Sequence, residues 1–340
     1  MNNKIALAGC GNVGTALLEI LQEKRSELAG KYGFTFEVVL ICDLMKGNIA
    51  DPQGLDLGKV LDAIHTRRGF AELPQARGTF AEMLESSHAT VLAEATPMDL
   101  KTGEPGMTHM KTALSHGVSV VTTNKGPISL ALDELVKLGA EHGASLRFEG
   151  TVMSGTPFIS MIREGMVGCK VKKVAGILNG TTNFMLTKMG EGLTYSQALE
   201  EARSHGYTEA DPSMDVEGWD PAVKVSIMAK IFFGMDVPVI KVERTGITGI
   251  TPGKVMEAAA AGCKVKLLAG VDEGPKGFHA FVKPAKVPFS DPLASIDSAT
   301  NAVTITTDNL GDVTIIGPGA GRRETGQALL EDIFALCRGK

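Results

Sequence analysis

Residues 4–14 read Lys-Ile-Ala-Leu-Ala-Gly-Cys-Gly-Asn-Val-Gly, an apolar run that leads directly into a glycine-rich turn. The apolar residues that follow recur at three- and four-residue spacing, at Val13, Leu17, Ile20 and Leu21. This spacing predicts an amphipathic helix that packs on a sheet. A strand, a glycine-rich turn and a helix in this order are typical of a doubly wound parallel sheet.

Further apolar runs alternate with helical patterns in the first 150 residues. Runs that are apolar on both faces predict parallel strands that helices cover on each side. We expect these strands at 4–8, 34–41, 89–95, 118–122 and 145–148. The N-terminal part of the chain is therefore predicted to be an α/β domain of the Rossmann type.

After Gly150 the pattern changes to helices first and strands later, which predicts an α+β domain of mostly antiparallel strands with helices on one side. A last amphipathic helix, 324–337, is expected to return to the first domain. We expect domain segments at 1–135, 136–316 and 317–340. Helices are expected at 156–166, 180–189, 195–204, 221–233 and 252–261, and strands at 171–178, 264–271, 278–282, 303–306 and 313–316.

Charge and cysteine content narrow the class of protein. The net charge is −5, without a basic face to follow a phosphate backbone, so nucleic acid is not an expected partner. Charges interrupt the apolar runs before they reach membrane-spanning length, so no membrane partner is expected either. Five cysteines without a Cys-x-x-Cys pair indicate neither a zinc cage nor a disulfide framework. A reducing, cytoplasmic location fits this cysteine pattern.

The glycine-rich turn has the context of a dinucleotide-binding loop. Gly9 permits the tight turn, Gly11 lets the backbone approach a pyrophosphate, and Gly14 allows close packing of helix on strand. Asn12 and Val13 begin the helix, whose free N–H groups face the anion. NAD or NADP is the expected cofactor, although a glycine turn that binds no ligand is the alternative.

Asp43 ends the second expected strand and is a candidate to bind the ribose 2′-hydroxyl. It follows Gly11 by 32 residues, whereas about 20 is usual, and the long first helix absorbs the excess. An acidic residue here favours NAD by repelling a 2′-phosphate, but Lys46 is close enough to offset that charge. An ordinary solvated group at the end of a strand is the alternative for Asp43.

Three further segments are assigned to the cofactor. Thr96 and Pro97 follow the third strand and Lys125 follows the fourth, and ligands of open α/β sheets bind at the carboxyl ends of strands. Gly319 and Gly321 precede the last helix and complete the assignment. Lys125 is alternatively a solvated loop cation.

The densest polar stretch is 206–224, in which five carboxylates stand within twelve residues. Asp220 followed by proline reads as an N-cap with proline at the first helical position. Lys224 then lies four residues after Asp220 on the same helix, so the two side chains can meet. The helix dipole and burial lower the pKa of a lysine whereas Asp220 raises it, and a lysine tuned in this way can exchange a proton with an alcohol. A plain surface ion pair is the alternative.

Three stretches, 124–127, 176–186 and 202–224, resemble motifs of the homoserine dehydrogenase family. The resemblance extends over essentially the whole chain and fills every position of the third motif. It implies an oxidoreductase that interconverts L-homoserine and L-aspartate 4-semialdehyde by hydride transfer, in the biosynthesis of threonine, methionine and isoleucine. Segment 1–135 would then bind the dinucleotide, 136–316 would bind substrate, catalyse and dimerise, and 317–340 would pack on the nucleotide domain.

Specific roles follow from the resemblance. It makes Lys224 the proton donor or acceptor, places Lys125 between nicotinamide and substrate, and assigns Glu209 and Asp220 to homoserine. Helix-terminus physics adds Thr182 as a donor to the substrate carboxylate. The loop 149–156 resembles the family's monovalent-cation loop, which implies sodium or potassium. The expected ligands are the side chain of Glu149 and the main-chain carbonyls of Val152, Ser154 and Thr156.

Family members commonly pair through the sheet of the second domain, so a homodimer is expected. The chain ends soon after Gly321, so no C-terminal regulatory domain is expected. An aldehyde dehydrogenase is a rival reading, but neither Cys169 nor Cys263 stands in a recognisable nucleophile motif. A dinucleotide sensor without chemistry is the other rival, and it would have no need of Lys125 and Lys224.

Overall fold

The computed structural model describes residues 2–208, 210–274 and 277–338. The chain divides into two compact units. One comprises the described residues of Met1–Gly155 and Gly321–Lys340, and the other comprises Thr156–Ala320. The first unit runs past the expected boundary at residue 135 because the last strand of its sheet, β6 (Leu146–Arg147), belongs to it.

The first unit contains a six-stranded sheet in the order β3-β2-β1-β4-β5-β6. All neighbours are parallel except β2 and β3, which are antiparallel. The predicted doubly wound sheet is confirmed, and β3 is an edge strand that the sequence reading missed. The strands are β1 Asn2–Ala8, β2 Thr35–Asp43, β3 Gly47–Ala50, β4 Val91–Glu94, β5 Ser119–Thr122 and β6 Leu146–Arg147.

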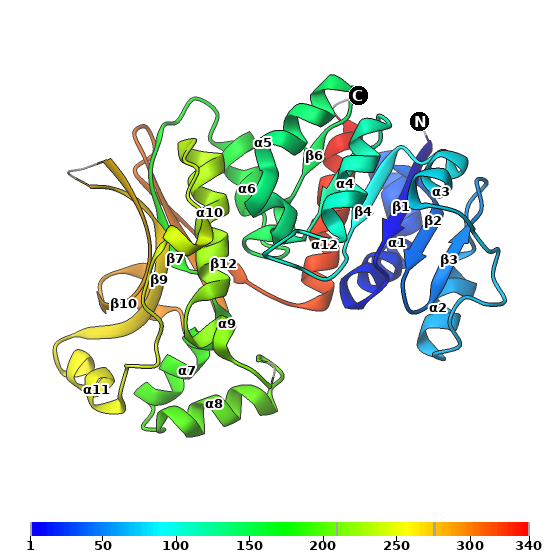
Figure 1. Ribbon diagram of the computed structural model, residues 1–340. Helices are drawn as coiled ribbons and strands as arrows, with labels where there is room; N and C mark the ends of the chain where they lie inside the picture. Colours follow the sequence, from blue (N-terminus) through cyan, green and yellow to red (C-terminus); the bar gives the residue numbers. More distant parts are fainter. Residues whose placement is uncertain (1, 209, 275–276, 339–340) are drawn as a thin grey trace. The chain divides into compact units, whose positions relative to one another are not determined.

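Helices flank this sheet, and the chain's last helix is among them (Figure 1). α12 packs closely on α1, because a Cβ added at Gly326 would lie 2.9 Å from the backbone nitrogen of Leu17. Salt bridges from Arg322 to Glu19 and from Arg323 to Glu23 join the same two helices. The elements are α1 Asn12–Tyr32, α2 Leu57–His65, α3 Phe80–Ser87, α4 Gly106–Ser115, α5 Lys125–Glu141, the short helix η1 Glu149–Thr151, and α12 Arg322–Arg338.

The second unit contains a six-stranded sheet in the order β12-β11-β7-β9-β10-β8. Its pairings are antiparallel except that of β10 with the two-residue strand β8, as the α+β reading predicted. The strands are β7 Val171–Ile177, β8 Glu243–Arg244, β9 Cys263–Gly274, β10 Gly277–Pro288, β11 Thr300–Thr307 and β12 Asp312–Pro318.

Helices of the second unit, among them α7, α10 and α11, pack against this sheet (Figure 1). The helix expected at 156–166 is instead a short α-helical turn followed by a π-helical segment. The elements are α6 Phe158–Ser160, η2 Met161–Gly165, α7 Gly180–Gly190, α8 Tyr195–Ser204, α9 Ser213–Val216, α10 Trp219–Phe233, η3 Val239–Lys241, α11 Pro252–Ala260 and η4 Pro292–Ser295.

Candidate active site

The glycine turn after β1 leaves room for a ligand at one position only. Gly9 has a φ of 87°, and a Cβ there would lie 2.6 Å from the carbonyl oxygen of Ala95. A Cβ on Gly14 would overlap the carbonyl oxygen of Gly9, because helix and turn touch at that point. The equivalent position at Gly11 has no atom within 4 Å. The turn is therefore packed at its two ends and open in the middle, which fits a loop that a phosphate approaches through its backbone.

Asp43 is tied to this turn by backbone hydrogen bonds. Its carboxylate accepts from the N–H groups of Cys10 at 2.8 Å, Met45 at 3.0 Å and Lys46 at 2.9 Å. Partial burial opposes ionisation, but these bonds together outweigh it and lower the pKa of Asp43. Lys46 donates from Nζ to the carbonyl of Cys10 at 2.8 Å. Asp43 and Lys46 thus present opposite charges beside the same loop.

A polar cluster that the sequence reading missed lies at the carboxyl ends of β4 and β5. Glu94 is fully buried and accepts hydrogen bonds from the N–H of Thr96 at 2.9 Å and the hydroxyl of Thr122 at 3.0 Å. Asn124 donates to the carbonyl of Thr96 at 3.3 Å and caps α5 by accepting from the N–H of Gly126 at 3.1 Å. The signal in the sequence was a carboxylate that closes an otherwise apolar strand.

The predicted residues Thr96, Pro97 and Lys125 all border this cluster. Thr96 is half-buried, Pro97 is exposed, and Lys125 is the first residue of α5, directly after its capping asparagine. Because the cap fixes where α5 begins, it also fixes where Lys125 leaves the backbone. The three residues lie at the carboxyl edge of the sheet, where a doubly wound fold binds its ligands.

In the second unit, Lys224 is buried and contacts oxygen atoms of Leu178 and Asp220. It is 5% exposed, and its Nζ donates to the carbonyl of Leu178 at 2.6 Å and contacts the carboxylate of Asp220 at 2.8 Å. Leu178 directly follows β7, so the sheet supplies one anchor and the first turn of α10 supplies the other. A buried ammonium requires such partners. The geometry excludes the alternative of a plain surface ion pair.

The predicted N-cap at Asp220 is wrong. α10 begins at Trp219 and its N-cap is Gly218, which adopts a left-handed φ of 80° that favours glycine. Asp220 therefore lies inside the first turn, and Pro221 follows it there. Proline is tolerated at this depth because the first N–H groups of a helix have no partner within the helix. As a result Asp220 is one turn below Lys224 and faces it.

Asn179 connects the elements of this site, although the sequence reading assigned it no role. Its Oδ1 caps α7 by accepting from the N–H of Thr182 at 2.9 Å. Its Nδ2 donates to Asp215 at 2.7 Å and to Asp220 at 3.2 Å. One side chain thus fixes the start of α7 and orients two carboxylates next to Lys224. An asparagine directly before a glycine that opens a helix was the available signal.

Asp215 is the second acidic group of the site. Burial raises the pKa of Asp215, and the nearby charge of Asp220 raises it further, while bonds from Asn179 and Thr208 act in the opposite direction. The hydroxyl of Thr208 donates to Asp215 at 3.1 Å. A carboxyl whose pKa is raised by burial next to another carboxylate is typical of functional sites.

Thr182 and Glu209 are two further predicted substrate contacts. Thr182 is fully buried, and both its N–H and its hydroxyl are bonded to Asn179 at 2.9 Å. Its contact with a substrate carboxylate stays a prediction that requires these bonds to rearrange. Glu209 lies outside the described residues.

The predicted cation loop includes a buried carboxylate. Glu149, in η1, is 3% exposed, and its N–H donates to the carboxylate of Asp332 on α12 at 2.7 Å. Burial raises the pKa of the neighbouring Glu331, and the charge of Glu149 adds to this effect. Val152, Ser154 and Thr156 are also buried, and Ser154 has a φ of 52°. Within the described residues, no three His, Cys, Asp or Glu side chains gather to hold a metal.

The two glycines assigned near the last helix lie in different units. Gly319 belongs to the second unit, directly after β12, and Gly321 begins the returning segment of the first unit with a φ of 136°. α12 starts at the next residue, Arg322.

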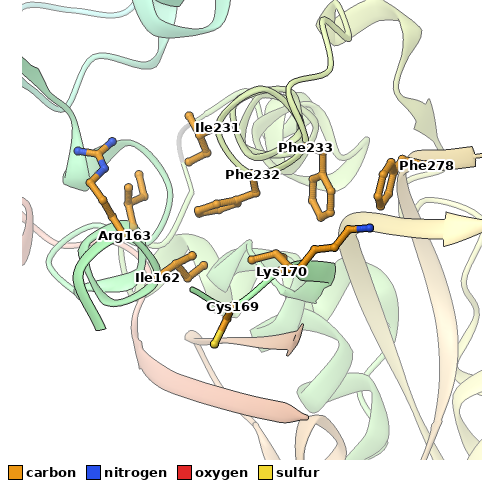
Figure 2. Close-up of a pocket in the computed structure, with 10 residues that line it drawn as sticks. Ile162, Arg163, Cys169, Lys170, Ile231, Phe232, Phe233 and Phe278 are labelled. Atoms are coloured by element: carbon orange, nitrogen blue, oxygen red, sulfur yellow. The ribbon is translucent and has the colours of Figure 1, made fainter. Parts of the chain in front are cut away.

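An apolar pocket of about 440 Å³ lies elsewhere in the second unit. Figure 2 shows Phe232 and Phe233 of α10 facing the side chain of Lys170, with Phe278 of β10 beside them. None of the predicted site residues lines this pocket. Phe232 is eight residues along α10 from Lys224, or roughly 12 Å along the helix axis. We take the polar cluster around Lys224 as the candidate site because it brings a buried lysine together with carboxylates, whereas no carboxylate lines this pocket.

No helix in the described parts of the chain has the length and apolar character needed to cross a membrane.

Comparisons with known proteins cover most of the chain. Residues 157–334 match a family model described as homoserine dehydrogenase, and residues 9–149 match one described as the NAD-binding domain of homoserine dehydrogenase. An NAD(+)-dependent homoserine dehydrogenase of Pseudomonas canavaninivorans is 38% identical over 98% of this chain and 96% of its own length.

Two solved structures are similar in fold. A putative homoserine dehydrogenase from Archaeoglobus fulgidus has a TM-score of 0.87 and 34% identity, with 98% of this chain and 99% of that chain covered. A homoserine dehydrogenase of a hyperthermophilic archaeon in complex with NADPH has a TM-score of 0.83 and 32% identity, with 100% of this chain and 99% of that chain covered.

Proposed function

The chain belongs to the homoserine dehydrogenase family, and on that premise we propose that Lys224 is the proton-transfer group of its reaction. The reaction is the NAD(P)-dependent interconversion of L-homoserine and L-aspartate 4-semialdehyde, in the pathway to threonine, methionine and isoleucine. The observation that carries the proposal is a buried ammonium held between the Leu178 carbonyl and the Asp220 carboxylate.

A bound nicotinamide would supply the hydride chemistry at the carbon that bears the hydroxyl. The chain must handle the accompanying proton. Neutral Lys224 accepts that proton from the hydroxyl during oxidation, and its ammonium form donates it to the aldehyde oxygen during reduction. Between oxidation turnovers the ammonium form loses the proton to solvent. Asp220 holds the lysine in position, and the Leu178 carbonyl limits the directions in which its N–H groups point.

Substrate recognition is proposed to use the acidic side of the same site. Asp220, together with Glu209, accepts hydrogen bonds from the ammonium group of homoserine. Thr182 contributes at the start of α7, where helix N–H groups attract a carboxylate. On the nucleotide side, the proposed contacts are Gly9, Gly11, Asn12, Val13, Gly14, Asp43, Thr96, Pro97, Lys125, Gly319 and Gly321.

Lys224→Ala tests the assignment. Loss of general acid–base catalysis should lower kcat by roughly two to four decades, with the Kd of NAD or NADP unchanged. Lys230→Ala is the matched control, because Lys230 lies on the same helix and pairs with Asp236 at 2.7 Å. Near-normal turnover in Lys224→Ala would remove Lys224 from the mechanism, and turnover absent from the unaltered chain would favour a dinucleotide sensor.

A monovalent cation is proposed to bind at the loop 149–156. Support comes from the buried Glu149 beside the buried Asp332, because two buried carboxylates favour a nearby cation. Sodium or potassium suits a site of oxygen ligands. Activity and melting temperature should rise with NaCl or KCl but not with choline chloride, and Glu149→Gln should abolish that difference. Equal responses to all three salts would contradict the site.

A homodimer formed through the second sheet is also proposed. β12 is an edge strand and carries Ile316, which is half exposed, and such an edge can pair with another chain. Sedimentation should give a dimer for the unaltered chain and a monomer for Ile316→Asp. Ile240→Asp, at an exposed apolar residue in η3, is the control that should leave the dimer intact.

A reducing, cytoplasmic location is proposed from the cysteines. None of the five forms a disulfide. Burial raises the pKa of Cys10 to about 11 and that of Cys42 to about 12, so both remain protonated and unreactive. Thiol titration of unfolded protein taken from cells under an alkylating quench should give five, and a lower value would contradict the proposal.

A further inference from the structure

Asn301 carries a buried carboxamide without a hydrogen-bond partner. The residue is fully buried on β11, and within the described residues neither its Nδ2 nor its Oδ1 is bonded. Buried polar groups are nearly always paired, and a donor and an acceptor left unpaired together oppose folding. A side chain of this kind points to a role outside the ligand-free fold.

The carboxamide lies against the backbone of Gly319. A Cβ added to Gly319 would overlap Nδ2 and Cγ of Asn301. The φ of Gly319 is not in the left-handed region, so the backbone alone would accept any residue there. Asn301 is therefore the feature that restricts position 319 to glycine.

The rest of the segment is held in a similar way. Asn301 pairs with Gly317 across the ladder of β11 and β12. A Cβ on Gly317 would overlap the hydroxyl of Thr156, which donates to the carbonyl of Pro318 at 3.0 Å. Residues 317–319 thus lie against two side chains that occupy the space of the missing Cβ atoms. Of these two side chains, Thr156 has a hydrogen-bond partner, whereas both polar atoms of the Asn301 side chain lack one.

We propose that Asn301 is a positioning residue for dinucleotide binding. Its carboxamide packs against Gly319 and fixes the path of the backbone there. The hydrogen bonds of this carboxamide are completed when the dinucleotide is bound. The inference rests on the proposed role of Gly319 in holding NAD or NADP. Asn301 acts through that glycine and does not take part in proton transfer.

Two single variants and their combination test the proposal. Asn301→Ala loses the donor and the acceptor, so the KM for the dinucleotide should rise roughly tenfold, with kcat and the KM for homoserine changed less than about twofold. Gly319→Ala should raise the same KM at least as much, because its methyl group overlaps Asn301. In Asn301→Ala/Gly319→Ala the space is free, so the KM should return to that of Asn301→Ala alone.

Controls separate positioning from damage to the fold. Thr307→Val removes another buried polar group from β11, at its other end, where the Thr307 hydroxyl accepts from Leu310 at 3.0 Å. This variant should lower the melting temperature without changing the dinucleotide KM. If Asn301→Ala does not fold, Asn301→Asp serves instead. It keeps a side chain of the same shape against Gly319 but replaces the donor, so it should raise the same KM.

The outcomes distinguish this inference from the proposed function. Two outcomes overturn the role of Asn301 and leave the proposed reaction intact. One is an unaltered dinucleotide KM in Asn301→Ala, and the other is a double variant whose dinucleotide KM is raised by the product of the two single effects. Failure of the unaltered chain to bind a dinucleotide overturns the proposed cofactor role instead, and the inference falls with it.

Discussion

Replacement of Asn179 by alanine is the perturbation whose size the structure defines best. The variant removes the N-cap of α7 and both bonds that Nδ2 donates to Asp215 and Asp220. An N-cap contributes about 1 kcal/mol, and a hydrogen bond to a charged group contributes about 1.5 kcal/mol at the lower end of its range. The lower end applies because Asp220 keeps contact with solvent. Asn179→Ala should therefore lower the free energy of unfolding by about 4 kcal/mol.

Thr194→Ala is the matched control. Thr194 caps α8 in the same unit, and its side chain bonds to Gln197 of the same capping box. Its loss should cost about 1 kcal/mol. Trp219, the chain's one tryptophan, lies in α10 next to the site, so urea unfolding followed by its fluorescence measures both variants locally. The difference between the two variants, about 3 kcal/mol, isolates the bonds to the carboxylates.

The same variant has a predicted effect on activity. The hydrogen bond from Nδ2 lowers the pKa of Asp215, so its removal raises that pKa and moves the acid limb of kcat/KM to higher pH. Orientation of Lys224 by Asp220 weakens as well, and kcat should fall. Equal destabilisation in Asn179→Ala and Thr194→Ala, with an unshifted pH profile, would show that Asn179 is a helix cap and nothing more.

Two further predictions concern charge. Asp43→Asn should raise the KM for NAD and reduce the preference for NAD over NADP, whereas Lys46→Met should weaken NADP binding more than NAD binding. Parallel steady-state kinetics with both cofactors check the two variants. If both variants shift the cofactor preference in the same direction, charge is excluded as the basis of that preference. Asp215→Asn should stabilise the protein at neutral pH while lowering turnover. The raised pKa of Asp215 gives a contribution to stability that is present at low pH and is lost as pH rises through that pKa, so the advantage of the variant should disappear in acid. Urea unfolding at several pH values measures this, and an advantage independent of pH would contradict it.

Strands and helices were predicted correctly from the sequence wherever the apolar residues of a segment followed a single spacing. Apolar runs with glycine turns located the strands of the first sheet, because strands buried on both faces have no polar positions to obscure the pattern. β3 was missed since a four-residue edge strand leaves too short a pattern to detect. The start of α10 was misplaced because Asp-Pro is a strong helix-start signal. The actual N-cap is Gly218, two residues before Asp220, which adopts a left-handed φ.

The candidate site was predictable in its charged residues and not in its neutral ones. Lys224 and Asp220 lie on one helix at a spacing that brings them together, so local geometry sufficed. Asn179 meets Asp215 and Asp220 only through tertiary folding, since it stands 36 and 41 positions from them. Glu94 and Asn301 are similar cases, because the meaning of a buried polar group depends on which neighbours pair with it. Single-sequence reasoning has no access to those neighbours.

The acidic pair next to Lys224 couples substrate binding to protonation. Burial and the charge of Asp220 both raise the pKa of Asp215, so this carboxyl begins to take up a proton at a higher pH than an ordinary aspartate. An ammonium group of homoserine bound at Asp220, next to Asp215, would favour the ionised form of Asp215 and lower that pKa again. By linkage, protonation of Asp215 must then weaken homoserine binding. The KM for homoserine should therefore rise as pH falls, while kcat at saturation changes less, because saturating substrate restores the ionised pair. A homoserine KM that stays flat through the acid limb would place the substrate ammonium away from Asp215.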